Sequence, residues 1–154
     1  MAKYGGTVRS ITPATNDDNW ILEAGAVART GRIVEFYWGG EATTSTAMCT
    51  RVARGSGQAG AGTAGNVAKF HPNHVTNVIS FFTTYATTQP TLDAGDLFAL
   101  SWNCHGGVAH WSALSADDGL FLLGNATPAS GATICCRNTV GTGTSTYGTV
   151  WMED

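Results

Sequence analysis

The sequence predicts an all-β fold, a single-domain, jelly-roll-like β-sandwich of about 8–10 strands. Short runs of β-branched and aromatic residues alternate with Gly, Asn, Asp, Thr and Pro turn signals roughly every 8–12 residues. Twenty glycines and many threonines favour turns and strands. No window of about a dozen residues carries a convincing helical stripe.

Ten segments have the composition of strands. They are Thr7–Thr12, Trp20–Ala28, Arg32–Trp38, Ser45–Ala53, Val75–Tyr85, Leu97–Asn103, Val108–Ser112, Leu120–Gly124, Thr133–Arg137 and Thr149–Met152. Alternation is clearest in the third segment, where Ile33, Glu35 and Tyr37 are expected on one face. The even-numbered residues from Val34 to Trp38 are expected on the opposite, apolar face.

Turn chemistry divides these strands. Asp93–Asp96 and Asp117–Gly119 are expected to form tight turns, because Asp and Gly tolerate the backbone angles that turns require. The Gly-rich stretch 55–65 is expected to be a flexible surface loop. Residues 1–12 are expected to form an N-terminal arm or first strand, and residues 13–154 the sandwich domain.

The chain carries few charges. Charged residues make up 12% of the 154 residues, against about 25% in an average soluble domain, and the formal net charge is −3. Because the sequence has no long run of like charges and no basic patch, we expect no nucleic-acid partner and no membrane partner. No segment approaches the roughly 20 apolar residues of a membrane span, and the start Met1–Gly6 lacks the apolar stretch of a signal peptide. Synthesis in the cytoplasm is therefore expected.

The cysteines and histidines offer the sharpest candidate chemistry. Cys104 and His105, followed by His110, suggest a nucleophilic pair or a zinc site, but adjacent strand residues face opposite sides. His71 and His74 have the spacing of a two-ligand turn, without a third ligand in view. We expect free thiols at all four cysteines, no metal, no cofactor and no enzymatic activity.

The five tryptophans separate into two groups. Trp38, Trp102 and Trp151 end or lie within strongly apolar segments and are expected in the core. Trp20 follows the polar stretch 16–19, and Trp111 follows a histidine. These two are expected at the surface, as platforms for sugars or anchors for a protein interface.

Two family resemblances add to this prediction. The segments Leu92–Leu100 and Gly119–Leu123 resemble strands of complement-C1q-like and tumour-necrosis-factor-like jelly rolls, over about a quarter of the chain. The order of segments also resembles the cement or decoration proteins of tailed-bacteriophage heads. Met1–Tyr4, Arg32–Glu35 and the acidic end Thr149–Asp154 carry that similarity, together with the Thr-, Ala- and Gly-rich body.

The second resemblance implies a virion structural protein. Such a protein binds the outside of a major capsid protein lattice, often as a homotrimer, so the expected location is the capsid surface. The candidate interface residues are Lys3, Tyr4, Arg9, Trp20 and Trp111. The alternative is a carbohydrate- or receptor-binding jelly roll that uses Trp20 and Trp111.

Overall fold

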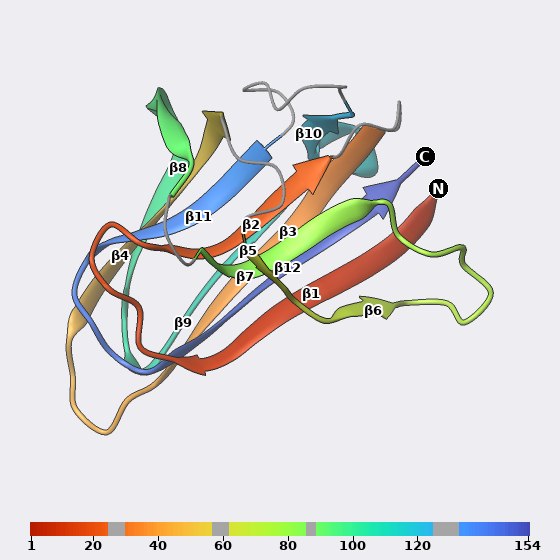
Figure 1. The fold of residues 1–154 in the computed structure, drawn as a ribbon. Coiled ribbons are helices and arrows are strands. Elements are labelled where there is room, and N and C mark those ends of the chain that lie inside the picture. Colours follow the sequence, from red (N-terminus) through yellow and green to blue (C-terminus); the bar gives the residue numbers. More distant parts are fainter. Residues whose placement is uncertain (25–29, 57–61, 86–88, 125–132) are drawn as a thin grey trace.

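The protein is built from two antiparallel β-sheets packed face to face (Figure 1). The computed structural model describes residues 1–24, 30–56, 62–85, 89–124 and 133–154. Twelve described strands are β1 (Ala2–Ile11), β2 (Asp18–Ala24), β3 (Thr30–Glu41), β4 (Ala47–Ser56), β5 (Gly62–Ala64), β6 (Val67–Lys69), β7 (Ile79–Tyr85), β8 (Thr91–Asn103), β9 (His105–Ser112), β10 (Leu120–Leu123), β11 (Thr133–Val140) and β12 (Ser145–Glu153). A single 3₁₀ turn, Ala116–Asp118, is the only helix among the described residues, and none there is long and apolar enough to cross a membrane.

The strand order is that of a jelly roll. Sheet A has the order β10-β3-β12-β1-β6, with β9 also beside β3, and sheet B has the order β5-β7-β2-β11-β4-β8. The pairs β1–β12, β2–β11, β3–β9 and β4–β8 nest inside one another, as in one long hairpin rolled into two sheets. The predicted all-β sandwich is therefore confirmed. The short strands β5 and β6 carry the chain from the edge of sheet B to the edge of sheet A.

Large aromatic rings fill the space between the sheets. The Phe36 ring stacks on Trp20 at a centroid distance of 5.2 Å and on Trp38 at 6.1 Å. Trp151 stacks on Tyr4 at 6.0 Å. All five side chains are at most 1% exposed. Because each such ring buries about 150–250 Å², this cluster supplies much of the apolar burial that stabilises the sandwich.

A second, smaller cluster lies on the outer side of sheet B. Ile21 and Cys135 are fully buried there, packed against Phe82 and Leu92. Residues 89–92 are tied across this side by two contacts: Pro90 O accepts a 3.0 Å hydrogen bond from the Arg137 guanidinium, and Asp18 N–H donates to Gln89 Oε1 at 3.1 Å. Both faces of the middle of sheet B are therefore covered.

A buried ion pair anchors the same region. Arg137 donates two hydrogen bonds to the Asp18 carboxylate, at 2.8 and 2.9 Å. Burial raises the pKa of Asp18, and the hydrogen bond and charge of Arg137 oppose that rise. Fork-like pairing of this kind fixes geometry as well as charge. It holds the start of β2 against β11.

Several expectations need correction. Asp93–Asp96 lies within β8, not in a turn, although the 3₁₀ turn does include Asp117. Residues 55, 56 and 62–64 of the expected loop belong to β4 and β5, and residues 57–61 lie outside the described residues. The expected strand Val75–Tyr85 begins only at Ile79, and its residues 75–78 have no regular structure.

The alternation expected for residues 32–38 is also wrong at its start. The pairing of β3 with β12 shifts register between Val150 and Trp151, so one extra β3 residue is accommodated. As a result Ile33 belongs to the core. Val34 instead lines the outer side of the sheet, beside Glu35.

Candidate interaction face

The side of sheet A that points away from the core is the best-defined exposed surface of the described chain. Its residues follow from the strand registers, because their sequence neighbours Tyr4, Phe36 and Trp151 point into the core. Each row across the sheet takes one residue from β1, one from β12, one from β3 and one from β10 or β9. The first three rows are Lys3, Met152, Arg32 and Phe121; Gly5, Val150, Glu35 and Ser112; and Thr7, Gly148, Tyr37 and His110. The fourth row has no β1 residue and consists of Thr146, Gly39 and Val108. We call this surface the outer face of sheet A.

Two glycines, Gly148 and Gly39, shape the outer face around Tyr37. A Cβ atom at Gly148 would lie 1.9 Å from Tyr37 Cζ, so the Tyr37 ring lies directly on the backbone of the neighbouring strand. The Tyr37 hydroxyl is hydrogen-bonded to Thr7 Oγ1 at 2.6 Å, which fixes the ring across β12. A Cβ atom at Gly39 would meet no atom within 4 Å. The face thus has one aromatic ring held in a fixed position and open space above Gly39.

Charged groups lie around Tyr37 on the outer face and are mostly paired. Glu35 lies between Lys3 Nζ, at 3.5 Å, and His110 Nε2, at 3.9 Å. Arg32 pairs with Asp117 and stacks on the Phe121 ring, 4.6 Å from its centroid. A shallow depression of about 220 Å³ lies beside Glu35. The pairing lowers the cost of covering these groups with a partner.

A hydrogen-bonded carboxylate, that of Glu41, contacts the last row of the outer face at Thr146. Glu41 accepts hydrogen bonds from Ser10 Oγ and from Thr146 Oγ1, and these lower the pKa of the Glu41 carboxyl. Ser10 has a positive φ of 51°, at the point where β1 loses register with β12. The bulge therefore ends regular pairing of β1 just beyond Arg9.

The predicted interface residues separate in the structure. Lys3 lies on the outer face, and Arg9 lies exposed near the end of β1. Tyr4 and Trp20 are fully buried, so the expectation that Trp20 is a surface residue is wrong. Trp111 is partly buried and stacks on Phe98 at 5.2 Å. The two tryptophans therefore form no shared platform.

Sequence reasoning missed the two glycines and the aromatic ring that shape this face. Gly39, Gly148 and Tyr37 were not among the candidates, although the expected strand alternation already placed Tyr37 on the same side as Glu35. The pattern that could reveal them is a glycine opposite an aromatic residue on a neighbouring strand. Finding it requires the register that pairs Gly148 with Tyr37, and this register cannot be derived from the two segments taken separately.

The candidate chemistry at Cys104 is not assembled. The Cys104 thiol is buried and donates a 3.4 Å hydrogen bond to Thr44 O. The His105 side chain is exposed, with Nδ1 2.8 Å from Ala42 O. Burial also raises the pKa of the thiols of Cys135 and Cys136, which makes them poor nucleophiles. Within the described ranges, no three metal-binding side chains gather, and all four cysteines are free.

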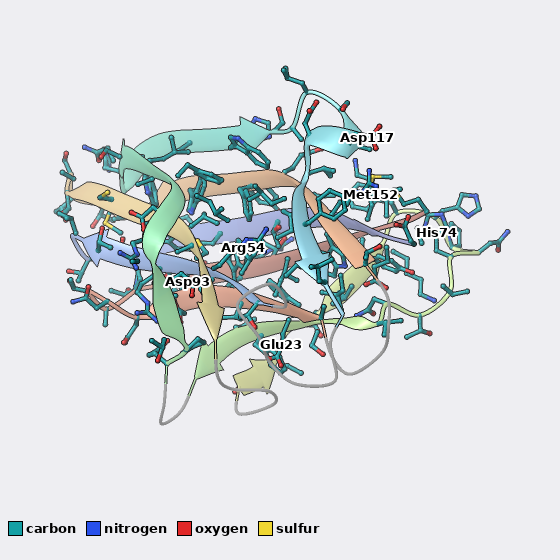
Figure 2. All side chains as sticks on the ribbon, turned by 90° about the horizontal axis from the view of Figure 1, so that it is seen from above. Glu23, Arg54, His74, Asp93, Asp117 and Met152 are labelled. Atoms are coloured by element: carbon teal, nitrogen blue, oxygen red, sulfur yellow. The ribbon has the colours of Figure 1, made fainter. Side chains whose placement is uncertain are left out.

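One perturbed carboxyl lies on the opposite sheet. Glu23 is 4% exposed, and burial raises its pKa from 4.5 to about 7. Its Oε2 atom has no hydrogen-bond partner among the described residues. In the registers of β2 it lies opposite Thr133 and Ser80, which carry no charge. Figure 2 shows Glu23 far from Met152, a residue of the outer face of sheet A.

Comparison with protein-family models, with curated proteins and with solved structures gave no match. A functional assignment therefore depends on the surface of this chain.

Proposed function

We propose that this chain is a capsid cement or decoration protein, which stabilises a tailed-phage head by binding the major capsid protein lattice through the outer face of sheet A. On this proposal it acts by binding and not by catalysis, and its location is the capsid surface.

The observation that supports this proposal is an open backbone position beside a fixed aromatic ring on the outer face. Gly39 leaves room for a second protein surface, and Tyr37, two residues away on the same strand, is a rigid aromatic anchor. The centres of protein interfaces have few charges and are rich in aromatic residues, with polar groups at the rim. Lys3 and Arg32 lie in the row at one end of this face, as such a rim requires.

We further propose that the protein binds the lattice as a homotrimer. Three identical weak contacts, made together, raise the avidity by about two to four orders of magnitude without any new contact. Light scattering should therefore give a mass three times that of the 16.0 kDa chain. A monomeric mass at micromolar concentration would contradict the trimer but not the binding face.

Carbohydrate binding has less support. It was predicted from a pair of exposed tryptophans, and Trp20 lies in the core. Binding to a glycan panel with no affinity for capsid shells would nevertheless make it the better assignment.

The test compares two glycine substitutions that fit the fold equally well. A side chain at Gly39 or at Gly95 meets nothing within 4 Å, and neither glycine has a positive φ. Gly39→Arg places a long charged side chain on the outer face, in the row next to Tyr37, whereas Gly95→Arg alters β8 in sheet B. Both variants should keep the melting temperature of the parent within a few degrees.

Binding is measured by co-sedimentation with shells assembled from the major capsid protein of the same phage. We expect Gly39→Arg to weaken binding at least about tenfold and Gly95→Arg to bind like the parent. Equal binding by both variants would exclude the outer face. Failure of the parent protein to bind any shell would refute the cement function itself.

A further inference from the structure

Strand β9 forms an edge of sheet A that no other described strand covers. It pairs with β3 on one side only. In Figure 2 the cyan β9 forms the upper border of the molecule, and the loop after it leads to the labelled Asp117. An uncovered edge presents backbone N–H and C=O groups that can pair with another extended chain.

The register identifies which groups point outward. Ala113 N–H donates a 2.9 Å hydrogen bond to Val34 O, so this pair belongs to the hydrogen-bonded set of the β3–β9 ladder. In an antiparallel ladder the sets alternate, so Trp111 and Ala109 also bond to β3. The N–H and C=O groups of Val108, His110 and Ser112 therefore point to the open edge.

Two other edges of the sandwich, those of β1 with β6 and of β8, are interrupted. β6 pairs with residues 4–6 of β1, and beyond them the bulge at Ser10 and the charge of Arg9 interrupt the edge. The edge strand β8 has two register shifts against β4, and its Asp96 is ion-paired with Arg51. From Val108 to Ser112, β9 has no register shift against β3, no proline and no Lys, Arg, Asp or Glu.

We propose that an extended segment of the capsid protein adds to β9 as a further strand of sheet A. This inference rests on the proposed function, because Val108, His110 and Ser112 also border the outer face on which that partner would lie. Strand addition satisfies the three outward backbone pairs and continues the sheet across the contact. It also explains why the edge needs no protection of its own: the partner covers it.

The first test reads the backbone directly. Amide hydrogen exchange is measured residue by residue, for the chain alone and for the chain bound to capsid shells. We expect exchange at Val108, His110 and Ser112 to slow at least about tenfold on binding, and exchange at Ala109 and Trp111 to change little, because those amides already bond to β3. Uniform protection along β9, or none, would overturn the proposal.

The second test removes one outward donor. Val108→Pro deletes an N–H that β3 does not use, and proline is tolerated at strand edges. Val108→Thr keeps the N–H and the β-branched shape. We expect the proline variant to bind shells about tenfold more weakly and the threonine variant to bind like the parent.

The outcomes separate the two proposals. If Gly39→Arg abolishes binding while Val108→Pro, folded by its circular dichroism spectrum, binds normally, the face is correct and strand addition is wrong. If the parent binds no shells, the proposed function fails. Alternating protection of β9 in the chain alone, rising with its concentration, would show that a second copy covers the edge, and would overturn the assignment to the capsid protein.

Discussion

Replacing Glu23 by glutamine should remove a pH-dependent loss of stability. The side chain is 4% exposed, and burial raises its pKa from 4.5 to about 7. Below pH 4.5 the carboxyl is protonated in the folded and unfolded chains alike, so its ionisation does not lower the free energy of unfolding. Between pH 4.5 and 7 only the unfolded chain releases the proton, so the free energy of unfolding falls as the pH rises. Above pH 7 the full cost is present.

The size of this loss follows from the two pKa values. Each pKa unit corresponds to about 1.4 kcal/mol, so the cost above pH 7 is about 3 kcal/mol. Urea unfolding of the parent and of Glu23→Gln is measured at pH 4 and pH 8. The free energy of unfolding of Glu23→Gln minus that of the parent should be about 2–3 kcal/mol higher at pH 8 than at pH 4. Comparing the two pH values cancels any pH-independent effect of the amide.

Glu35→Gln is the matched control. Glu35 is an exposed carboxylate paired with Lys3. The free energy of unfolding of Glu35→Gln minus that of the parent should therefore change by less than about 1 kcal/mol between pH 4 and pH 8. If Glu23→Gln gives the same stability difference at both pH values, the carboxyl is solvated in the folded chain and the reasoning from burial is wrong.

Three further substitutions test the packing. Trp20→Ala should lower the free energy of unfolding by about 3–5 kcal/mol in urea titrations, because the ring is fully buried; a surface residue would cost under about 0.5 kcal/mol. Gly148→Ala should displace the Tyr37 ring, cost about 1–3 kcal/mol and weaken shell binding, which thermal unfolding and co-sedimentation will show. His74 Nδ1 accepts the Lys3 N–H at 3.3 Å. At a fixed pH, exchange of the Lys3 amide should be faster in His74→Phe, which has no acceptor, than in the parent or in His74→Asn, whose side-chain oxygen can accept.

Local composition was enough to locate most strands. Each of the ten expected segments overlaps one observed strand, because β-branched and aromatic residues between turn signals depend on neighbouring residues alone. The two missed strands, β5 and β6, have only three residues each and no apolar pattern. They are strands only because β7 and β1 offer them partners. Asp93–Asp96 was misread for the same reason: pairing with β4 overrides its turn chemistry.

Burial of β2 depends on residues far away in sequence. The polar residues before Trp20 suggested a surface position, but Asp18 is neutralised by Arg137, 119 positions later. β2 lies in the middle of sheet B, with its outer side covered around Ile21. Neither the ion pair nor the covering segment can be deduced from residues 16–24 alone. Only part of the outer face of sheet A was predictable in the same way. Strand alternation predicted the side on which Tyr37 lies, but it could not predict the bulge at Val34 or the register with Gly148.

The two outer sides of the sandwich differ in a way that bears on function. On sheet B, Phe82 and Leu92 pack against the buried Ile21 and Cys135, and Pro90 bonds to Arg137, so this side is used for the protein's own stability. On sheet A the corresponding centre carries glycines and a ring laid flat on Gly148, and Gly39 has open space above it. A sheet whose outer side needed only solvent contact would gain from larger β-branched residues there, because glycine weakens strands. The Tyr37 ring accounts for Gly148, whereas the open space above Gly39 is better explained by a second surface that approaches the backbone closely.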